Sequence, residues 1–274
     1  MGNFFMMRLL TLALAVGLAV GLAGCDSFDY HPYDVRVDGE RNINATNAAA
    51  IEHACLDATA IRFAVVSDTQ GCYDETRDMV DDVNARADID FVIHLGDLTD
   101  YGSTREFTLQ RDILGKLKVP YVTCIGNHDC LGNGEETFAA IFGDVDFEFI
   151  AGRVKFVMLN TNALEYDYGR AIPNFDFIER CATSRVDAFD RTVVAMHAKP
   201  TSDVFNNNVS RLFNEETHEL PQLLFCLCGH DHQQQVFDLY GDGTLYYQVA
   251  NIAKRKYYIF TITADGYSYE DISF

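Results

Sequence analysis

The sequence predicts an α/β fold in one domain, a sandwich that ends in mainly antiparallel strands. Over residues 61–125, apolar β-rich runs alternate with helical patterns, which is typical of βαβ units around a sheet covered on both faces. After residue 232 the chain reads strand, turn, strand twice, with Asp-Gly pairs at Asp242-Gly243 and Asp265-Gly266. The chain has 274 residues and no internal repeat, which suits one sizeable domain.

Each predicted element is a run with its own periodicity. The β-rich apolar runs lie at residues 61–66, 91–95, 121–125, 154–159, 192–196, 223–228, 235–239, 245–250, 257–263 and 267–272. The helical patterns between them cover residues 74–87, 103–117 and 172–184. The second of these helices opens with Ser103-Thr104-Arg105-Glu106, in which the serine and glutamate side chains can cap each other's backbone amides.

The N-terminal residues predict a targeting segment. An almost unbroken apolar run follows Arg8 and ends at Leu22-Ala23-Gly24-Cys25. Its length of about 15 residues is short for a membrane span but suits the apolar part of a signal peptide. The pattern resembles a bacterial lipoprotein signal, with residues 1–24 removed and Cys25 lipidated; an uncleaved anchor and an ordinary signal are the alternatives. We therefore expect a lipid-anchored, extracytoplasmic protein of the cell envelope, on the periplasmic face of the inner membrane or at the outer membrane or cell surface.

The rest of the chain divides by composition. Residues 25–58 are polar without a sustained period and predict a tether or loosely packed lead-in, and residues 59–274 form the folded domain. The formal net charge is −20, which argues against nucleic acid as a partner because a polyanion would be repelled.

The cysteine count favours unpaired thiols. Of eight cysteines, the one at position 25 is assigned to lipidation, and seven cannot all pair. Cys226 and Cys228 alternate along an apolar strand and should face the same way, as buried small hydrophobes do. A disulfide among Cys55, Cys72 and Cys130 is left open.

Ligand-type side chains follow five of the predicted strands, at the point where each strand ends. The clusters are Asp68-Thr69-Gln70, Gly96-Asp97-Leu98-Thr99-Asp100, Gly126-Asn127-His128-Asp129, His197 and Gly229-His230-Asp231-His232. Any one of them alone reads as a turn or a structural histidine. Together they supply the carboxylate, amide and imidazole groups that a pair of divalent cations requires, and sheets place ligands at this edge.

The order and residue types of these clusters resemble the motifs of the calcineurin-like metallophosphoesterases. The resemblance covers residues 62–232 and the closing strands. The resemblance implies a four-layer α/β/β/α sandwich of mixed sheets with flanking helices. It also implies a dinuclear centre, with the first metal held by Asp68, Gln70 and His232, the second by Asn127, His197 and His230, and Asp97 bridging both. His128 would stabilise the reacting phosphoryl oxygens or protonate the leaving group, and Asp100 would orient His128.

One position departs from the family pattern. The first motif is commonly Asp-x-His, and Gln70 stands where the histidine would be. A neutral oxygen donor shifts the preference toward Mn²⁺ or Mg²⁺ and weakens the first site. We expect two divalent metal ions, with Mn²⁺ favoured and iron, Zn²⁺ or Mg²⁺ as alternatives.

The resemblance predicts a phosphoric ester hydrolase in which a bridging hydroxide attacks phosphorus. The expected partner is an extracytoplasmic phosphomonoester or phosphodiester, such as a small phosphate ester, a nucleotide or a lipid phosphate. Residues 160–162 and 206–208 are candidate substrate loops, with ordinary polar loops as the alternative. The alternative function is a membrane-anchored lipoprotein whose degenerate metal site binds a ligand without hydrolysis.

Overall fold

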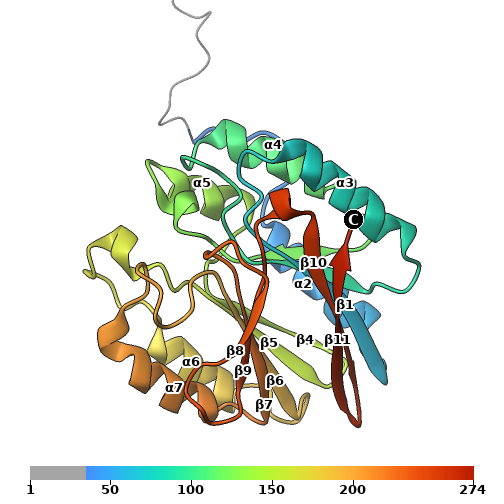
Figure 1. The fold of residues 1–274 in the computed structure, drawn as a ribbon, viewed down its shortest axis with the longest axis vertical. Helices are drawn as coiled ribbons and strands as arrows, with labels where there is room; N and C mark the ends of the chain where they lie inside the picture. Colours follow the sequence, from blue (N-terminus) through green and yellow to red (C-terminus); the bar gives the residue numbers. More distant parts are fainter. Residues whose placement is uncertain (1–34) are drawn as a thin grey trace, which may run out of the picture. The chain divides into compact units, whose positions relative to one another are not determined.

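A computed structural model describes residues 35–274, which form two mixed sheets packed face to face (Figure 1). The predicted signal peptide and Cys25 lie outside the described residues. Among the helices that the structure describes, none has the length and apolar character needed to cross a membrane.

The first sheet has five strands and the second has six. In spatial order the first contains β11 (Gly266–Ser273), β10 (Lys256–Thr263), β1 (Ala60–Val66), β2 (Phe91–His94) and β3 (Tyr121–Thr123). The second contains β4 (Phe147–Ala151), β5 (Val154–Leu159), β6 (Arg191–Met196), β7 (Leu223–Cys228), β9 (Leu245–Gln248) and β8 (Gln235–Asp238). The strands β1, β2 and β3 run parallel, as do β5, β6, β7 and β9. The predicted hairpins β8–β9 and β10–β11 are antiparallel.

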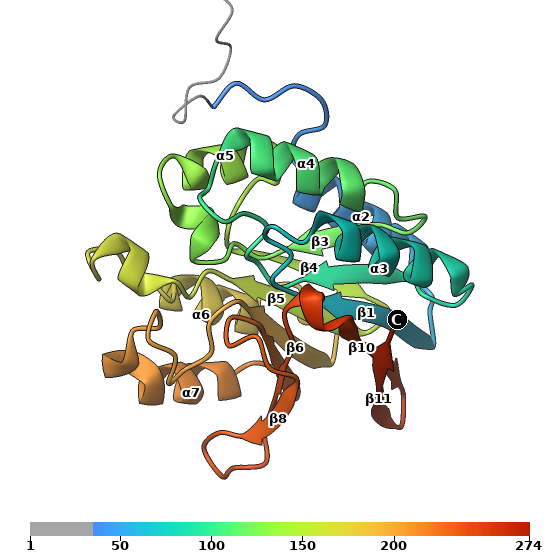
Figure 2. The same cartoon turned by 45° about the horizontal axis from the view of Figure 1, so that its top comes forward.

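Helices cover the outer faces of both sheets, so the predicted α/β/β/α order is confirmed (Figure 2). The helices are α2 (Ile43–Ala54), α3 (Tyr73–Ala85), α4 (Thr104–Leu114), α5 (Gly134–Ile141), α6 (Phe175–Thr183) and α7 (Ser210–His218). α3 and α4 pack on the first sheet, and α6 and α7 on the second. The predicted capping box at Ser103 and Glu106 is present with both of its hydrogen bonds.

Strand alternation explains the layers, because neighbouring side chains point to opposite faces of a sheet. In β1, Phe63 lies in the core between the sheets, while Ala64 faces the helices. Phe63 stacks on Phe91 at a centroid distance of 5.0 Å and meets Phe156 edge to face at 5.2 Å. This closely packed aromatic core supports the strand ends that carry the predicted ligands.

The prediction of a loosely packed lead-in over residues 25–58 was wrong for its last part. Helix α2 packs against β3 of one sheet and β4 of the other, and it buries Ile43, Ala48 and Ile51. The buried face also contains Asn44. Because the buried face of α2 contains small and polar residues, its hydrophobicity shows no clear helical period, and the sequence did not predict this helix. α5, β4 and α7 are also absent from the sequence prediction.

Asn44 satisfies the open edge of β3. Its side-chain amide donates to the Thr123 carbonyl at 2.9 Å, and its carbonyl oxygen accepts from the Thr123 amide at 2.8 Å. Thr123 is fully buried, so these backbone groups have no access to water.

We expect Asn44→Ala to lower the free energy of unfolding by about 2–4 kcal/mol, because two buried backbone groups would lose their partners. Asn47→Ala is the matched control. Asn47 donates a single bond, to the Tyr121 carbonyl, so its loss should cost only about 1 kcal/mol. Urea denaturation of both variants measures the difference; equal effects would contradict the role of Asn44.

Candidate metal centre

Four of the predicted ligand residues adopt the left-handed backbone conformation. The φ angle is +54° at Asp68, +58° at Asp97, +70° at His230 and +58° at His232. A residue other than glycine costs roughly 1–3 kcal/mol in this region, and such strain gathers at functional sites. The three strand ends that carry these residues are therefore held by the surrounding fold in a conformation they would not adopt alone.

Two glycines of the motifs are required by close approach. A Cβ atom on Gly126 would lie 2.2 Å from Asp97 Oδ1, and one on Gly229 would lie 2.0 Å from Ser67 Oγ and 2.8 Å from Asp68 Oδ2. Any side chain at these positions would displace the two buried carboxylates. The glycines thus let the backbone of one motif rest against the carboxylate of another.

One group of donor atoms surrounds Asp68. Its buried Oδ1 accepts no hydrogen bond and lies 3.2 Å from His232 Nε2. Ligand atoms of Asp68, Asp97 and His232 all lie within 4.8 Å of one another. The amide of Gln70 reaches the same place, with Nε2 3.4 Å from Asp97 Oδ2 and a buried Oε1 that has no partner. Rotating this amide by half a turn exchanges the two atoms, and the oxygen would then face the group.

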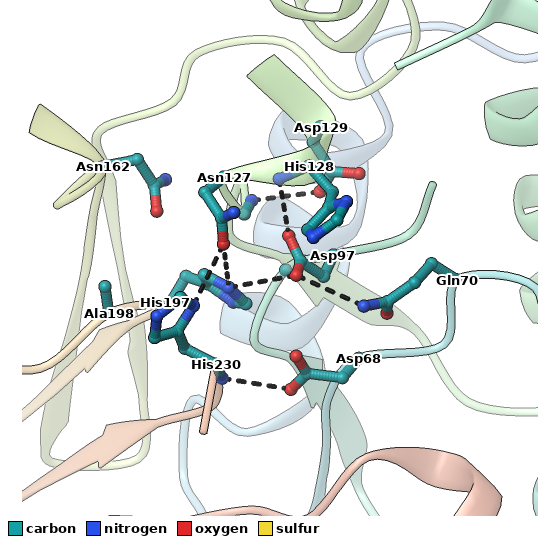
Figure 3. A network of polar contacts seen from close by, with 12 residues as sticks. Asp68, Gln70, Asp97, Asn127, His128, Asp129, Asn162, His197, Ala198 and His230 are labelled. Atoms are coloured by element: carbon teal, nitrogen blue, oxygen red, sulfur yellow. Dashed lines mark hydrogen bonds and ion pairs between the residues drawn. The ribbon is translucent and has the colours of Figure 1, made fainter. Parts of the chain in front are cut away.

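A second group surrounds the side-chain oxygen of Asn127 (Figure 3). Asn127 Oδ1 lies 3.1 Å from His197 Nε2 and 3.0 Å from His230 Nδ1. His197 Nε2 is also 3.3 Å from Asp97 Oδ2. The structure thus brings all seven predicted ligand side chains together, with Asp97 between the two groups.

The spacing and chemistry of these donors fit divalent cations. Ligand atoms at bond lengths of about 2.1 Å lie roughly 3.0–3.4 Å from one another around a single ion, as the atoms here do. The unpartnered buried oxygen of Asp68 is a donor that requires a cation or a proton. The mixture of carboxylate, amide and imidazole groups suits Mn²⁺, iron or Zn²⁺.

A backbone contact fixes the tautomer of His197. Its Nδ1 lies 2.8 Å from the Leu95 carbonyl oxygen and donates to it. The lone pair of Nε2 is then directed at Asp97 Oδ2 and Asn127 Oδ1, which are also lone-pair donors. A neutral His197 therefore needs a cation among these three atoms.

The field of the site is strongly negative. Although burial lowers the pKa of His197, the carboxylates of Asp97 and Asp68 outweigh it and raise the pKa to about 10. The close contact of its ring with the Asp68 carboxylate raises the pKa of His232, and the positive charge of His197 lowers the pKa of Asp97 despite its burial. A proton on His197 occupies the place where a metal ion would supply positive charge.

His128 is held by its neighbours, but one of them differs from the prediction. Its backbone amide donates to Asp97 Oδ1 at 2.9 Å, and Nδ1 lies 2.9 Å from the carbonyl oxygen of Asp100. The prediction that the Asp100 side chain orients His128 was therefore wrong in the group that makes the contact. The backbone oxygen accepts from Nδ1, which leaves Nε2 for a substrate.

Comparison with known proteins decides the family. Residues 61–234 match the family model described as calcineurin-like phosphoesterase. The chain belongs to the calcineurin-like phosphoesterase family. It is also 24% identical over 157 residues to a 3′,5′-cyclic-nucleotide phosphodiesterase of Nostoc sp.; the match covers 54% of this chain and 58% of that protein. The chain thus matches less than two thirds of this relative's length.

Solved structures of low sequence identity share the fold. GAP50, described as the anchor in the inner membrane complex of Plasmodium, has a TM-score of 0.58 at 10% identity, covering 78% of this chain and 85% of that chain. A purple acid phosphatase from yellow lupin seeds has a TM-score of 0.55 at 15% identity, covering 78% and 52%. TT1561 of Thermus thermophilus has a TM-score of 0.54 at 13% identity, covering 78% and 99%. The two sheets flanked by helices are therefore those of this family, whose members are metal-dependent phosphoester hydrolases.

Two buried residues of this phosphoesterase, Asp129 and His94, connect the motif loops and were not predicted as functional. Asp129 Oδ1 accepts from the Leu98 and Thr99 amides, and its Oδ2 accepts from the Gly126 amide at 3.0 Å. His94 accepts from the Gly96 amide at Nδ1, so its Nε2 donates to the Thr69 hydroxyl. Burial lowers the pKa of His94 to about 4, which keeps it neutral. A buried polar residue inside an apolar strand was the signal for His94.

The candidate substrate loops are structural. Asn162 is fully buried and donates to the Ile125 carbonyl, and Asn207 bonds within its own loop to Thr201 and Ser202. All seven cysteines among residues 35–274 are free, and Cys226 and Cys228 face the same helical layer as predicted.

We expect the stability of the metal-free phosphoesterase to fall as the pH rises. The pKa of His197 in the folded protein, about 10, exceeds its usual value near 6.5. The protonated ring therefore contributes stability that is complete below about pH 6.5 and is lost as the pH rises toward 10. Thermal unfolding from about pH 6.5 to 9 should show a declining Tm without metal and a flatter curve with Mn²⁺.

His197→Gln is the control for this measurement, because the variant lacks the titrating ring. Its metal-free Tm should change less over the same pH range. A wild-type curve as flat as that of the variant would contradict the assignment.

Proposed function

We propose that this phosphoesterase hydrolyses a small phosphodiester at a dinuclear divalent-metal centre. Asp68, Gln70 and His232 would hold one cation and Asn127, His197 and His230 the other, with Asp97 shared. The observation that carries the proposal is the position of Asp97 Oδ2, which lies 3.4 Å from the Gln70 amide and 3.3 Å from His197 Nε2. One oxygen thus faces both groups of donors, so Asp97 could be shared between two cations.

The chain's own residues supply position and proton transfer. Two divalent cations bound there would polarise the phosphoryl oxygens and provide a hydroxide nucleophile near neutral pH. Asp97 Oδ1 holds the His128 backbone and the Asp100 carbonyl holds its ring, so the imidazole is fixed in place. His128 Nε2 then donates a hydrogen bond to a phosphoryl oxygen or a proton to the leaving group.

We propose Mn²⁺ as the preferred ion, with iron, Zn²⁺ and Mg²⁺ as alternatives. Three imidazoles favour a transition metal, while the Gln70 and Asn127 oxygens are hard, neutral donors. Manganese accepts both kinds of ligand.

Acidic residues around the site support a diester as the substrate. The exposed Asp203 carboxylate lies 3.0 Å from His230. Burial raises the pKa of Glu165, and the charges of Asp97 and Asp203 raise it further. Asp100 lies beside His128 as well. Such a rim repels a doubly charged monoester more than a singly charged diester. The match to a cyclic-nucleotide phosphodiesterase favours the same class.

We expect metal-dependent turnover of a chromogenic phosphodiester, faster than that of the matching monoester, after the protein is stripped of metal and reloaded with Mn²⁺. Asp97→Asn should lose both turnover and metal. His128→Ala should lose about 10²- to 10⁴-fold in turnover while both ions stay bound. Equal metal loss in these two variants would contradict the division of roles.

Asp100→Asn is the control that separates the backbone from the side chain. The Asp100 carbonyl remains in this variant, so turnover should fall by less than about tenfold.

We further propose that the protein is anchored through a lipid on Cys25 on the extracytoplasmic side of the envelope. The support is the sequence pattern at residues 9–25. In cells that express the full chain, wild-type protein should partition into the detergent phase on Triton X-114 separation, and Cys25→Ala should move to the aqueous phase. Aqueous wild-type protein would overturn the proposal.

A further inference from the structure

An exposed carboxylate contacts one of the proposed ligands from outside the centre. Asp203 Oδ1 lies 3.0 Å from His230 Nε2, while Nδ1 on the other side of that ring faces Asn127 Oδ1 at 3.0 Å. We propose that Asp203 is a positioning residue that fixes the tautomer of His230 for the second cation. The inference rests on the proposed dinuclear centre.

The two ring nitrogens of His230 have different roles: Nε2 carries the proton, and Nδ1 provides the lone pair for a cation. A neutral imidazole carries one proton, which resides on the nitrogen with the better acceptor. If the proton were on Nδ1, it would bond to Asn127 Oδ1 and leave no lone pair for a cation. Asp203 accepts from Nε2 and thereby frees the Nδ1 lone pair. Carboxylates beside ligating imidazoles commonly act in this way.

The loop that carries Asp203 is built to hold it. Thr201 has a φ of +80°, a strained angle for a β-branched residue. The Asn207 side chain accepts from the Thr201 amide at 2.7 Å and donates to the Ser202 carbonyl at 2.7 Å. On the other side, Val204 is buried and its carbonyl accepts from the Leu164 amide. The backbone on both sides of Asp203 is therefore anchored, which places its carboxylate beside His230.

Stability does not explain the contact. The Asp203 side chain is 83% exposed, and a salt bridge to so exposed a group contributes little to folding stability. The acid that neighbours His230 in the sequence, Asp231, is paired with Lys199 and lies in a different contact. The partner of His230 therefore comes from a separate loop, and its effect falls on the orientation of the ring.

The experiment titrates Mn²⁺ into metal-free protein and follows free Mn²⁺ by electron paramagnetic resonance. The variants are Asp203→Ala, Asp203→Asn and Glu165→Gln. The asparagine keeps an oxygen that accepts from Nε2, while Glu165→Gln removes a charge from the same rim without touching His230. Melting curves of the metal-free variants verify that each is folded.

We expect wild type to bind two ions and Asp203→Ala to bind the second one about 10- to 100-fold more weakly. Asp203→Asn should retain most of the affinity, and Glu165→Gln, which removes only a neighbouring charge, should lose much less than Asp203→Ala. Unchanged affinity in Asp203→Ala, equal loss in Asp203→Asn, or equal loss in Glu165→Gln would each overturn the inference. A wild type that binds fewer than two ions would instead overturn the dinuclear centre itself.

Discussion

Between the two sheets, the Asp97 carboxylate receives the His128 amide on one oxygen and faces the His197 ring with the other. Asp97 follows a strand of the first sheet, and His197 follows a strand of the second. An ionised carboxylate that is only 1% exposed is costly unless positive charge and hydrogen bonds compensate it. The contacts that compensate the charge of Asp97 come from loops of both sheets, and they bring these loops together in one site.

Supporting that charge imposes strain nearby. Asp68, Asp97, His230 and His232 all have positive φ angles, and Gly126 and Gly229 lie against the carboxylates. These conformations persist because the strands behind them are fixed by close packing of aromatic rings, such as the contact between Phe225 and Phe260 at 4.8 Å. Packing in the interior thus compensates for the backbone strain at the metal ligands.

The electrostatic potential at the metal centre would differ from that of the protein surface. The protein carries a net charge of −20, so a phosphate ester gains nothing from the overall field. Attraction must be local, and cations held by Asp68, Asp97 and neutral ligands would supply it. With cations bound, a positive site behind an acidic rim would favour substrates of low negative charge over polyanions such as nucleic acids.

Short-range patterns in the sequence were sufficient to predict most of the strands and helices. Strands with apolar periodicity, the capping box at Ser103 and the motif residues at strand ends are all short-range patterns, and they predicted most of the elements. The seven candidate ligands followed from the motif residues together with the resemblance to the family. The helix α2 escaped this reading because its buried face includes Asn44 and small alanines, whose burial only β3 and β4 explain.

Tertiary structure alone decided the finer roles. The Asp100 carbonyl rather than its side chain holds His128, and Asp203 reaches His230 from 27 positions away in the chain. A sequence gives the side chains but does not show which backbone carbonyl points into a site. The contact between the Asp100 carbonyl and His128 therefore could not be predicted. The contact between Asp203 and His230 depends on a loop whose geometry is set by Asn207 and Val204, and contacts between distant segments follow from packing rather than from any local pattern.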